Sequence, residues 1–162
     1  MNPKRYLFLL LTCLCAAVTL HAADDVRCTN NTARSWWDVQ RYVINLSVDT
    51  ANGHLSGSVN LTAYVAGRAG DSLQIDLQEP LKIKAISTFG FDRDEKPLVF
   101  FKKGNAYYLT GNLDALVKNK TIKLRIQYEG IPQIAARAPW DGGIVLDRDA
   151  QGTRWMGVAC QG

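Results

Sequence analysis

The residues that most often perform chemistry are scarce in this chain. Only two of the 162 residues are histidines, His21 and His54. His21 falls in a predicted leader, so the mature chain would keep one. One histidine excludes a self-contained two-histidine zinc site and weakens any case for a histidine-containing catalytic triad. His54 follows the turn residues Asn52 and Gly53, where we expect an exposed polar side chain rather than a ligand.

The acidic residues do not supply a clear alternative. Asp92 and Asp94 could form a glycosidase pair or part of a calcium loop, but the run Asp-Arg-Asp-Glu-Lys is more typical of a solvated turn. The sequence contains neither a Gly-rich phosphate loop nor a Gly-x-Ser-x-Gly elbow. We therefore predict no catalytic residue and no metal site in this chain.

Tryptophans and cysteines offer binding or structural roles. Exposed tryptophan often marks sugar or peptide sites, and Trp36 and Trp37 are adjacent. Because neighbours on an extended chain point to opposite faces, at most one should face the core, with the other covering an edge. Cys28 and Cys160 could form one disulfide in an oxidising compartment, or both could be unpaired.

The N-terminus has the layout of a secretory signal peptide. Lys4 and Arg5 precede an apolar run, Tyr6–Leu20, and then the small residues Ala22 and Ala23. The run is shorter than the roughly 20 residues that span a membrane. We expect a signal peptide at 1–22, a polar segment at 23–35 and one β domain at 36–162. The mature chain would be periplasmic or extracellular, with no membrane span.

The charge balance also excludes a class of partner. Without Lys4 and Arg5 the chain has 17 basic and 15 acidic residues, a net charge of +2. Binding to nucleic acid would call for a clustered basic face, so we expect no nucleic-acid partner.

Period-two alternation of apolar and polar residues dominates the rest of the chain. Residues 42–48 and 55–65 alternate around the turn chemistry of 49–53, which predicts a hairpin. Further strands are expected at 72–77, 81–88, 98–102, 106–110, 121–129, 144–147 and 153–158, with one helical turn at 113–118. The sequence therefore predicts an all-β fold, an antiparallel β-sandwich or curved saddle-like sheet of about eight or nine strands.

Two segments near the C-terminus are less generic. Pro139-Trp140-Asp141-Gly142-Gly143 is a turn motif placed before an apolar strand. Trp155-Met156-Gly157-Val158-Ala159-Cys160-Gln161-Gly162 is a strand that runs to the last residue without a stopping signal.

With these two motifs and the early strands 38–49, 55–63 and 73–77, the chain resembles the N-terminal domain of the aminopeptidase N family of zinc metallopeptidases, which also includes leukotriene hydrolase. The resemblance covers essentially the whole mature chain, with one departure at Ala138, where bacterial members often have a second proline.

The resemblance implies a non-catalytic domain of a secreted aminopeptidase that removes N-terminal residues from peptides. The family's zinc motif His-Glu-x-x-His and its Gly-x-Met-Glu-Asn motif are absent from this sequence. Zinc would therefore belong to a catalytic domain of the same or a neighbouring polypeptide, and this chain alone should be inactive. By the same resemblance, Gln161 would help to hold the α-amino group of a peptide substrate, and Trp140 would brace its turn.

A second hypothesis is a free-standing exported β-sandwich. It would bind a peptide, sugar or protein through Trp36, Trp37 or an open sheet edge.

Overall fold

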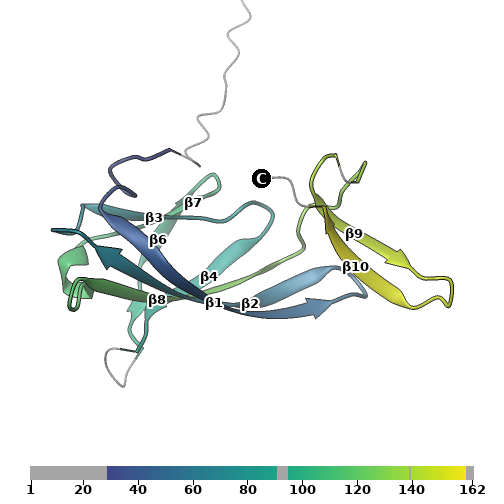
Figure 1. The fold of residues 1–162 in the computed structure, drawn as a ribbon, viewed down its shortest axis with the longest axis horizontal. Helices are drawn as coiled ribbons and strands as arrows, with labels where there is room; N and C mark the ends of the chain where they lie inside the picture. The colour runs from purple at the N-terminus through teal and green to yellow at the C-terminus, as the bar shows by residue number, and fades with distance from the viewer. Residues whose placement is uncertain (1–28, 91–94, 139, 160–162) are drawn as a thin grey trace, which may run out of the picture.

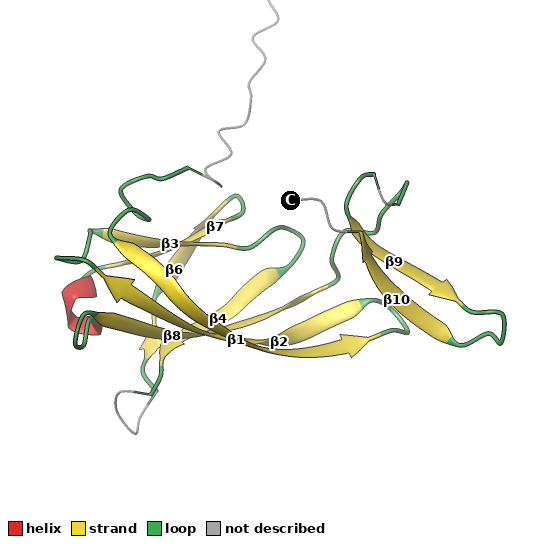
Figure 2. Cartoon of the chain, viewed as in Figure 1, coloured by secondary structure: helices red, strands yellow, loops and turns green. Residues whose placement is uncertain are grey.

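The computed structural model describes residues 29–90, 95–138 and 140–159. Within them the chain is almost entirely β (Figure 2), with a single 3-10 turn. The predicted all-β antiparallel fold is confirmed, with ten strands rather than eight or nine. Among these residues there is no helix of the length and apolarity that a membrane span requires. The elements are β1 Trp37–Asp49, β2 His54–Val65, β3 Ser72–Asp76, β4 Lys82–Thr88, β5 Pro97–Leu98, β6 Phe100–Lys103, β7 Ala106–Thr110, η1 Leu113–Leu116, β8 Thr121–Gly130, β9 Gly143–Arg148 and β10 Arg154–Ala159.

The largest sheet has five antiparallel strands in the order β1-β2-β8-β4-β5. The predicted β1–β2 hairpin is its longest unit. In its turn the Asp49 carboxylate accepts a hydrogen bond from the Ala51 backbone N–H (2.8 Å), and Gly53 takes a positive φ of 75°. A residue with a side chain would be strained there, which explains the Asn-Gly signal in the sequence.

A three-stranded sheet, β3-β7-β6, packs over one part of the five-stranded sheet (Figure 1). The core lies between the two sheets because the alternating apolar residues of β2, β4 and β8 face those of β3 and β7. Its buried members are Leu61, Ala63, Val65, Leu73, Ile83, Ile86, Tyr107, Leu109, Leu113, Ile122, Leu124 and Ile126.

One predicted strand, 98–102, is in fact two. Leu98 in β5 pairs with Ile86 of the five-stranded sheet, whereas Phe100 in β6 pairs with Leu109 of the three-stranded sheet. The chain crosses between the sheets at Val99, whose side chain is 89% exposed. The apolar run predicted one continuous strand because alternation does not say which sheet a residue joins.

The third sheet is the hairpin of β9 and β10, which Figure 1 shows beyond the β1–β2 turn. It touches that turn closely: a Cβ on Gly53 would meet the side chains of Leu146 and Ile144 at 2.9 and 3.0 Å. The guanidinium of Arg154 also donates to the backbone carbonyl of Ala51 (2.6 Å). The hairpin is therefore held at the tip of the long sheet, away from the main core.

Replacing Leu124 by alanine should lower the free energy of unfolding by about 2–5 kcal/mol, because the side chain is fully buried between the two sheets. Urea unfolding followed by fluorescence measures the change. The matched control, Val99→Ala, removes an exposed side chain and should shift stability by no more than about 0.5 kcal/mol. Equal effects at the two positions would contradict the assignment of the core.

Candidate functional site

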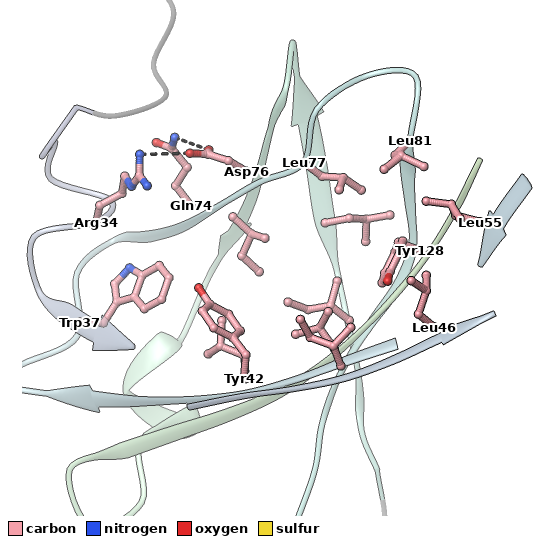
Figure 3. Close-up of a pocket in the computed structure, with 16 residues that line it drawn as sticks. Arg34, Trp37, Tyr42, Leu46, Leu55, Gln74, Asp76, Leu77, Leu81 and Tyr128 are labelled. Carbon is pink, nitrogen blue, oxygen red and sulfur yellow. Dashed lines mark hydrogen bonds and ion pairs between the residues drawn. The ribbon is translucent and has the colours of Figure 1, made fainter. Parts of the chain in front are cut away.

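An open groove of about 540 Å³ lies where β1 and the start of β2 extend past the three-stranded sheet (Figure 3). Its walls are mainly apolar. The lining residues are Trp37, Tyr42, Ile44, Leu46, Leu55, Val59, Leu61, Ile75, Leu77, Leu81, Ile83, Ile126 and Tyr128, with Arg34, Gln74 and Asp76 at one end. The alternation in β1 predicted that Tyr42, Ile44 and Leu46 share one face, and they do, but that face is open.

The polar end of the groove is a cluster of side chains joined by an ion pair and hydrogen bonds (Figure 3). The Arg34 guanidinium lies 3.0 Å from an Asp76 carboxylate oxygen. The Gln74 amide donates to the other oxygen of Asp76 (2.7 Å) and accepts from the Asn31 amide (2.8 Å). Gln74 is buried, so these hydrogen bonds offset its desolvation. The cluster ties the segment before β1 to β3.

Two tyrosines that line the groove have raised pKa values. Burial raises the pKa of the Tyr42 hydroxyl above its ordinary value, partly opposed by the positive charge of Arg34. Burial also raises the pKa of Tyr128. Both shifts follow from the cost of placing a phenolate against apolar walls.

The two adjacent tryptophans are structural. The indole N–H of Trp36 donates to the Ser72 carbonyl, and that of Trp37 donates to the Ala33 carbonyl, both at 2.9 Å. Both rings pack against the core cluster. The expectation that at most one faces the core is wrong because Trp36 lies in the turn before β1, where strand alternation does not apply.

The described residues do not fit a zinc site. They contain no group of three or more histidine, cysteine, aspartate or glutamate side chains that could hold a metal ion. His54 begins β2 and is half-buried rather than exposed, because the turn before it packs against β9.

The turn motif before β9 is held largely by Asp141. One of its carboxylate oxygens accepts hydrogen bonds from the backbone N–H groups of Ala136 and Arg137, both at 2.7 Å. Gly143 has a φ of 102°, and a Cβ there would lie 2.4 Å from the Gln133 carbonyl. The backbone N–H of Trp140 donates to the Arg137 carbonyl (2.9 Å). Trp140 as a whole is 75% exposed.

A row of apolar side chains crosses the base of the β9–β10 hairpin. Ile134 forms a parallel bridge with Ile144, and Ile144 pairs with Val158 in β10. Ile144 is buried, whereas Val158 is 65% exposed and Ile134 is about half exposed. We call the three exposed residues of this region, Ile134, Trp140 and Val158, the hairpin face.

The sequence predicted neither a role for Ile134 nor an open groove beside β1. The only available signal was the length of the apolar alternation in residues 42–65, which exceeds that of the later strands.

Several predicted positions lie outside the described residues. They are the leader at 1–22, Cys28, Asp92, Asp94, Pro139, Cys160 and Gln161. The disulfide and the role of Gln161 stay predictions.

This chain resembles known proteins in its three-dimensional structure. No protein-family model and no curated protein matches the sequence. An M1 zinc metallopeptidase from Deinococcus radiodurans matches 75% of this chain with a TM-score of 0.51 and 19% identity. The chain therefore shares its fold with part of a zinc metallopeptidase. Native yeast LTA4 hydrolase matches 59% of the chain, with a TM-score of 0.45 and 19% identity.

The match covers only part of each relative. The chain spans 29% of the Deinococcus enzyme and 14% of the yeast hydrolase. The predicted fold is confirmed by the likeness to the Deinococcus enzyme, and the matched region is a part of that larger protein.

Replacing Asp141 by alanine should loosen the turn before β9, because two backbone N–H groups would lose their acceptor. Hydrogen exchange at Ala136 and Arg137 should become faster. Asp149→Ala is the matched control, since Asp149 accepts from Gln151 and Thr153 in the next turn. Unchanged exchange at 136–137 in the Asp141 variant would contradict this assignment.

The groove tyrosines predict a loss of stability at high pH. A folded-state pKa above the ordinary value of 10 means that the stabilisation is complete below pH 10 and is lost as the pH rises through the folded pKa. Tyrosinate absorbance should therefore develop at higher pH in the native chain than in denaturant. Tyr42→Phe and Tyr128→Phe should each remove one hydroxyl that ionises above the ordinary tyrosine range. Superimposable native and denatured titrations would contradict the raised pKa of both hydroxyls.

Proposed function

We propose that this chain is the N-terminal, non-catalytic β domain of a secreted zinc-dependent aminopeptidase. It acts as a scaffold and as part of the substrate cleft. The catalytic domain, in the same or a neighbouring polypeptide, holds the zinc and cleaves the N-terminal residue from a peptide substrate.

The observation that carries this proposal is the β9–β10 hairpin. A two-stranded hairpin is marginally stable alone in water and needs another surface to pack against. Here it contacts the tip of the β1–β2 hairpin yet leaves Val158, Ile134 and Trp140 exposed. An apolar surface of this kind is typical of a protein–protein contact. The shared fold with part of the Deinococcus metallopeptidase supports an enzyme domain as the occupant.

The division of labour follows from the residues present. The described part of the chain cannot assemble a zinc site, so metal and general base would both come from the catalytic domain. Gln161 comes two residues after the end of β10 in the sequence and would accept a hydrogen bond from the substrate's α-ammonium group. Asp141 and Gly143 would fix the hairpin that carries it.

Export is part of the same proposal. The basic residues Lys4 and Arg5, the apolar run and the small residues after it support cleavage of a leader and a periplasmic or extracellular location.

A second candidate function is a free-standing exported binding module for a peptide, sugar or protein. The apolar groove favours it, because an apolar cavity with a polar end suits an extended ligand. Trp36 and Trp37 do not support it, since both indole N–H groups bond to backbone carbonyls.

The test begins with the coding sequence beyond Gly162 and in neighbouring genes. A segment with Gly-x-Met-Glu-Asn and His-Glu-x-x-His would be produced with and without this chain. The pair should bind zinc and hydrolyse aminoacyl-anilides, whereas this chain alone should do neither. Val158→Asp should weaken association of the two parts, because it charges the hairpin face, and the exposed control Val99→Asp should not.

Two results would contradict the proposal. One is tightly held zinc together with turnover in this chain alone. The other is a genuine stop codon after Gly162 with no gene nearby that encodes the missing motifs, which would favour the binding module.

A further inference from the structure

Strand β1 forms one edge of the five-stranded sheet. Among the described residues only β2 pairs with it, so one side of the strand presents unpaired backbone N–H and C=O groups. After the irregularity between Val39 and Arg41, its register with β2 is unbroken from Arg41 to Asp49. The edge is therefore a regular nine-residue template.

This edge lacks the features that usually prevent edge-to-edge pairing. Natural edge strands carry lysine, proline, bulges or inward-pointing charges. Residues 41–49 contain no lysine or proline, and their only charges are at the two ends. The residues between them include four exposed apolar side chains on one face: Tyr42 57%, Ile44 62%, Leu46 53% and Val48 41%.

The sequence of this edge is complementary to itself. In an antiparallel pair centred on Asn45, Arg41 of one copy faces Asp49 of the other. Tyr42 then faces Val48, and Ile44 faces Leu46. Opposite charges and apolar pairs directly across an antiparallel ladder are stabilising. No ion pair to Arg41 or Asp49 is formed within the described residues, although one carboxylate oxygen of Asp49 accepts the Ala51 backbone N–H in the turn.

We propose that two copies of this chain pair through β1, antiparallel and centred on Asn45, to join their five-stranded sheets into one ten-stranded sheet. The contact is a closed two-fold interface, in which the same strand is used on both sides.

The two neighbouring registers pair fewer of the apolar residues with one another and do not pair Arg41 with Asp49. Centring the pair on Ile44 places Asp49 against Val39 and Val48 against Gln40. Centring it on Leu46 places Arg41 against Ala51 and Tyr42 against Thr50. Only the Asn45 register pairs all four apolar residues with one another and both charges with their opposites.

The proposed dimer is independent of the proposed catalytic-domain contact. It uses residues 41–49 of β1, whereas the hairpin face consists of Ile134, Trp140 and Val158. Failure of either contact would leave the other unaffected.

Sedimentation velocity and light scattering on the purified chain between about 1 and 500 µM test the oligomeric state. A monomer–dimer equilibrium is expected, and a monomer at every concentration would overturn the proposal. Larger, open-ended aggregates without a dimer would also overturn it.

Cysteine crosslinking tests the register. Opposite residues have Cβ atoms about 4.5–5.5 Å apart, within reach of a disulfide. Under mild oxidation Asn45→Cys should therefore link two copies through residue 45, as identified by peptide mapping. The matched control Ser47→Cys lies on the same strand and face, but its two copies would be about 13 Å apart. Equal crosslinking at both positions would overturn the register.

Charge reversal supplies an independent readout. Arg41→Glu creates two like-charge pairs in the dimer and should raise its dissociation constant about tenfold. Arg41→Lys keeps the charge and should leave the constant close to that of the parent chain. Circular dichroism establishes that each variant is folded. If the Arg41→Glu and Arg41→Lys variants dimerise with the same dissociation constant, a different surface forms the dimer and the proposal fails.

Discussion

The structure depends on a mismatch in strand length. β1 and β2 are 13 and 12 residues long, whereas β3, β6 and β7 have five, four and five. The short sheet can bury only part of the long one, so Leu61, Ala63 and Val65 at the end of β2 form the core while Ile44 and Leu46 of β1 line an open groove. Burial of apolar area is the main stabilising term, so the uncovered half contributes little.

The same mismatch places the two surfaces for which we propose partners. The exposed end of the β1–β2 hairpin is the support on which β9 and β10 rest, through Gly53 and Ala51. The well-packed core therefore acts as an anchor, and the surfaces available to partners lie beyond it. One is the hairpin face, where we place a metal-bearing domain, and the other is the edge of β1. In such a domain the buried core lies at one end, and the surfaces that we propose as contacts lie at the other.

Much of the fold could be predicted from the sequence because alternation and turn chemistry are local signals. Residues 42–48 and 55–65 around Asn52-Gly53 predicted the long hairpin correctly. The assignment of strands to sheets could not be predicted, because the crossing at Val99 depends on which neighbours Leu98 and Phe100 find. The packing of both Trp36 and Trp37 was missed for a similar reason: the segment before β1 is a turn. The hairpin face was anticipated only as a motif, since exposure of Val158 is a property of the tertiary structure.

The most direct test of the account is hydrogen exchange on this chain with and without the zinc-binding domain that we propose as its partner. We expect slower exchange at Ile131, Gln133, Ile134 and 154–158 on addition of that domain. The amides of Leu61 and Leu124 should not change, because both residues are already buried. Unaltered exchange across the β9–β10 hairpin in a zinc-loaded, active mixture would contradict it, because the hairpin would then not be the surface that the catalytic domain covers.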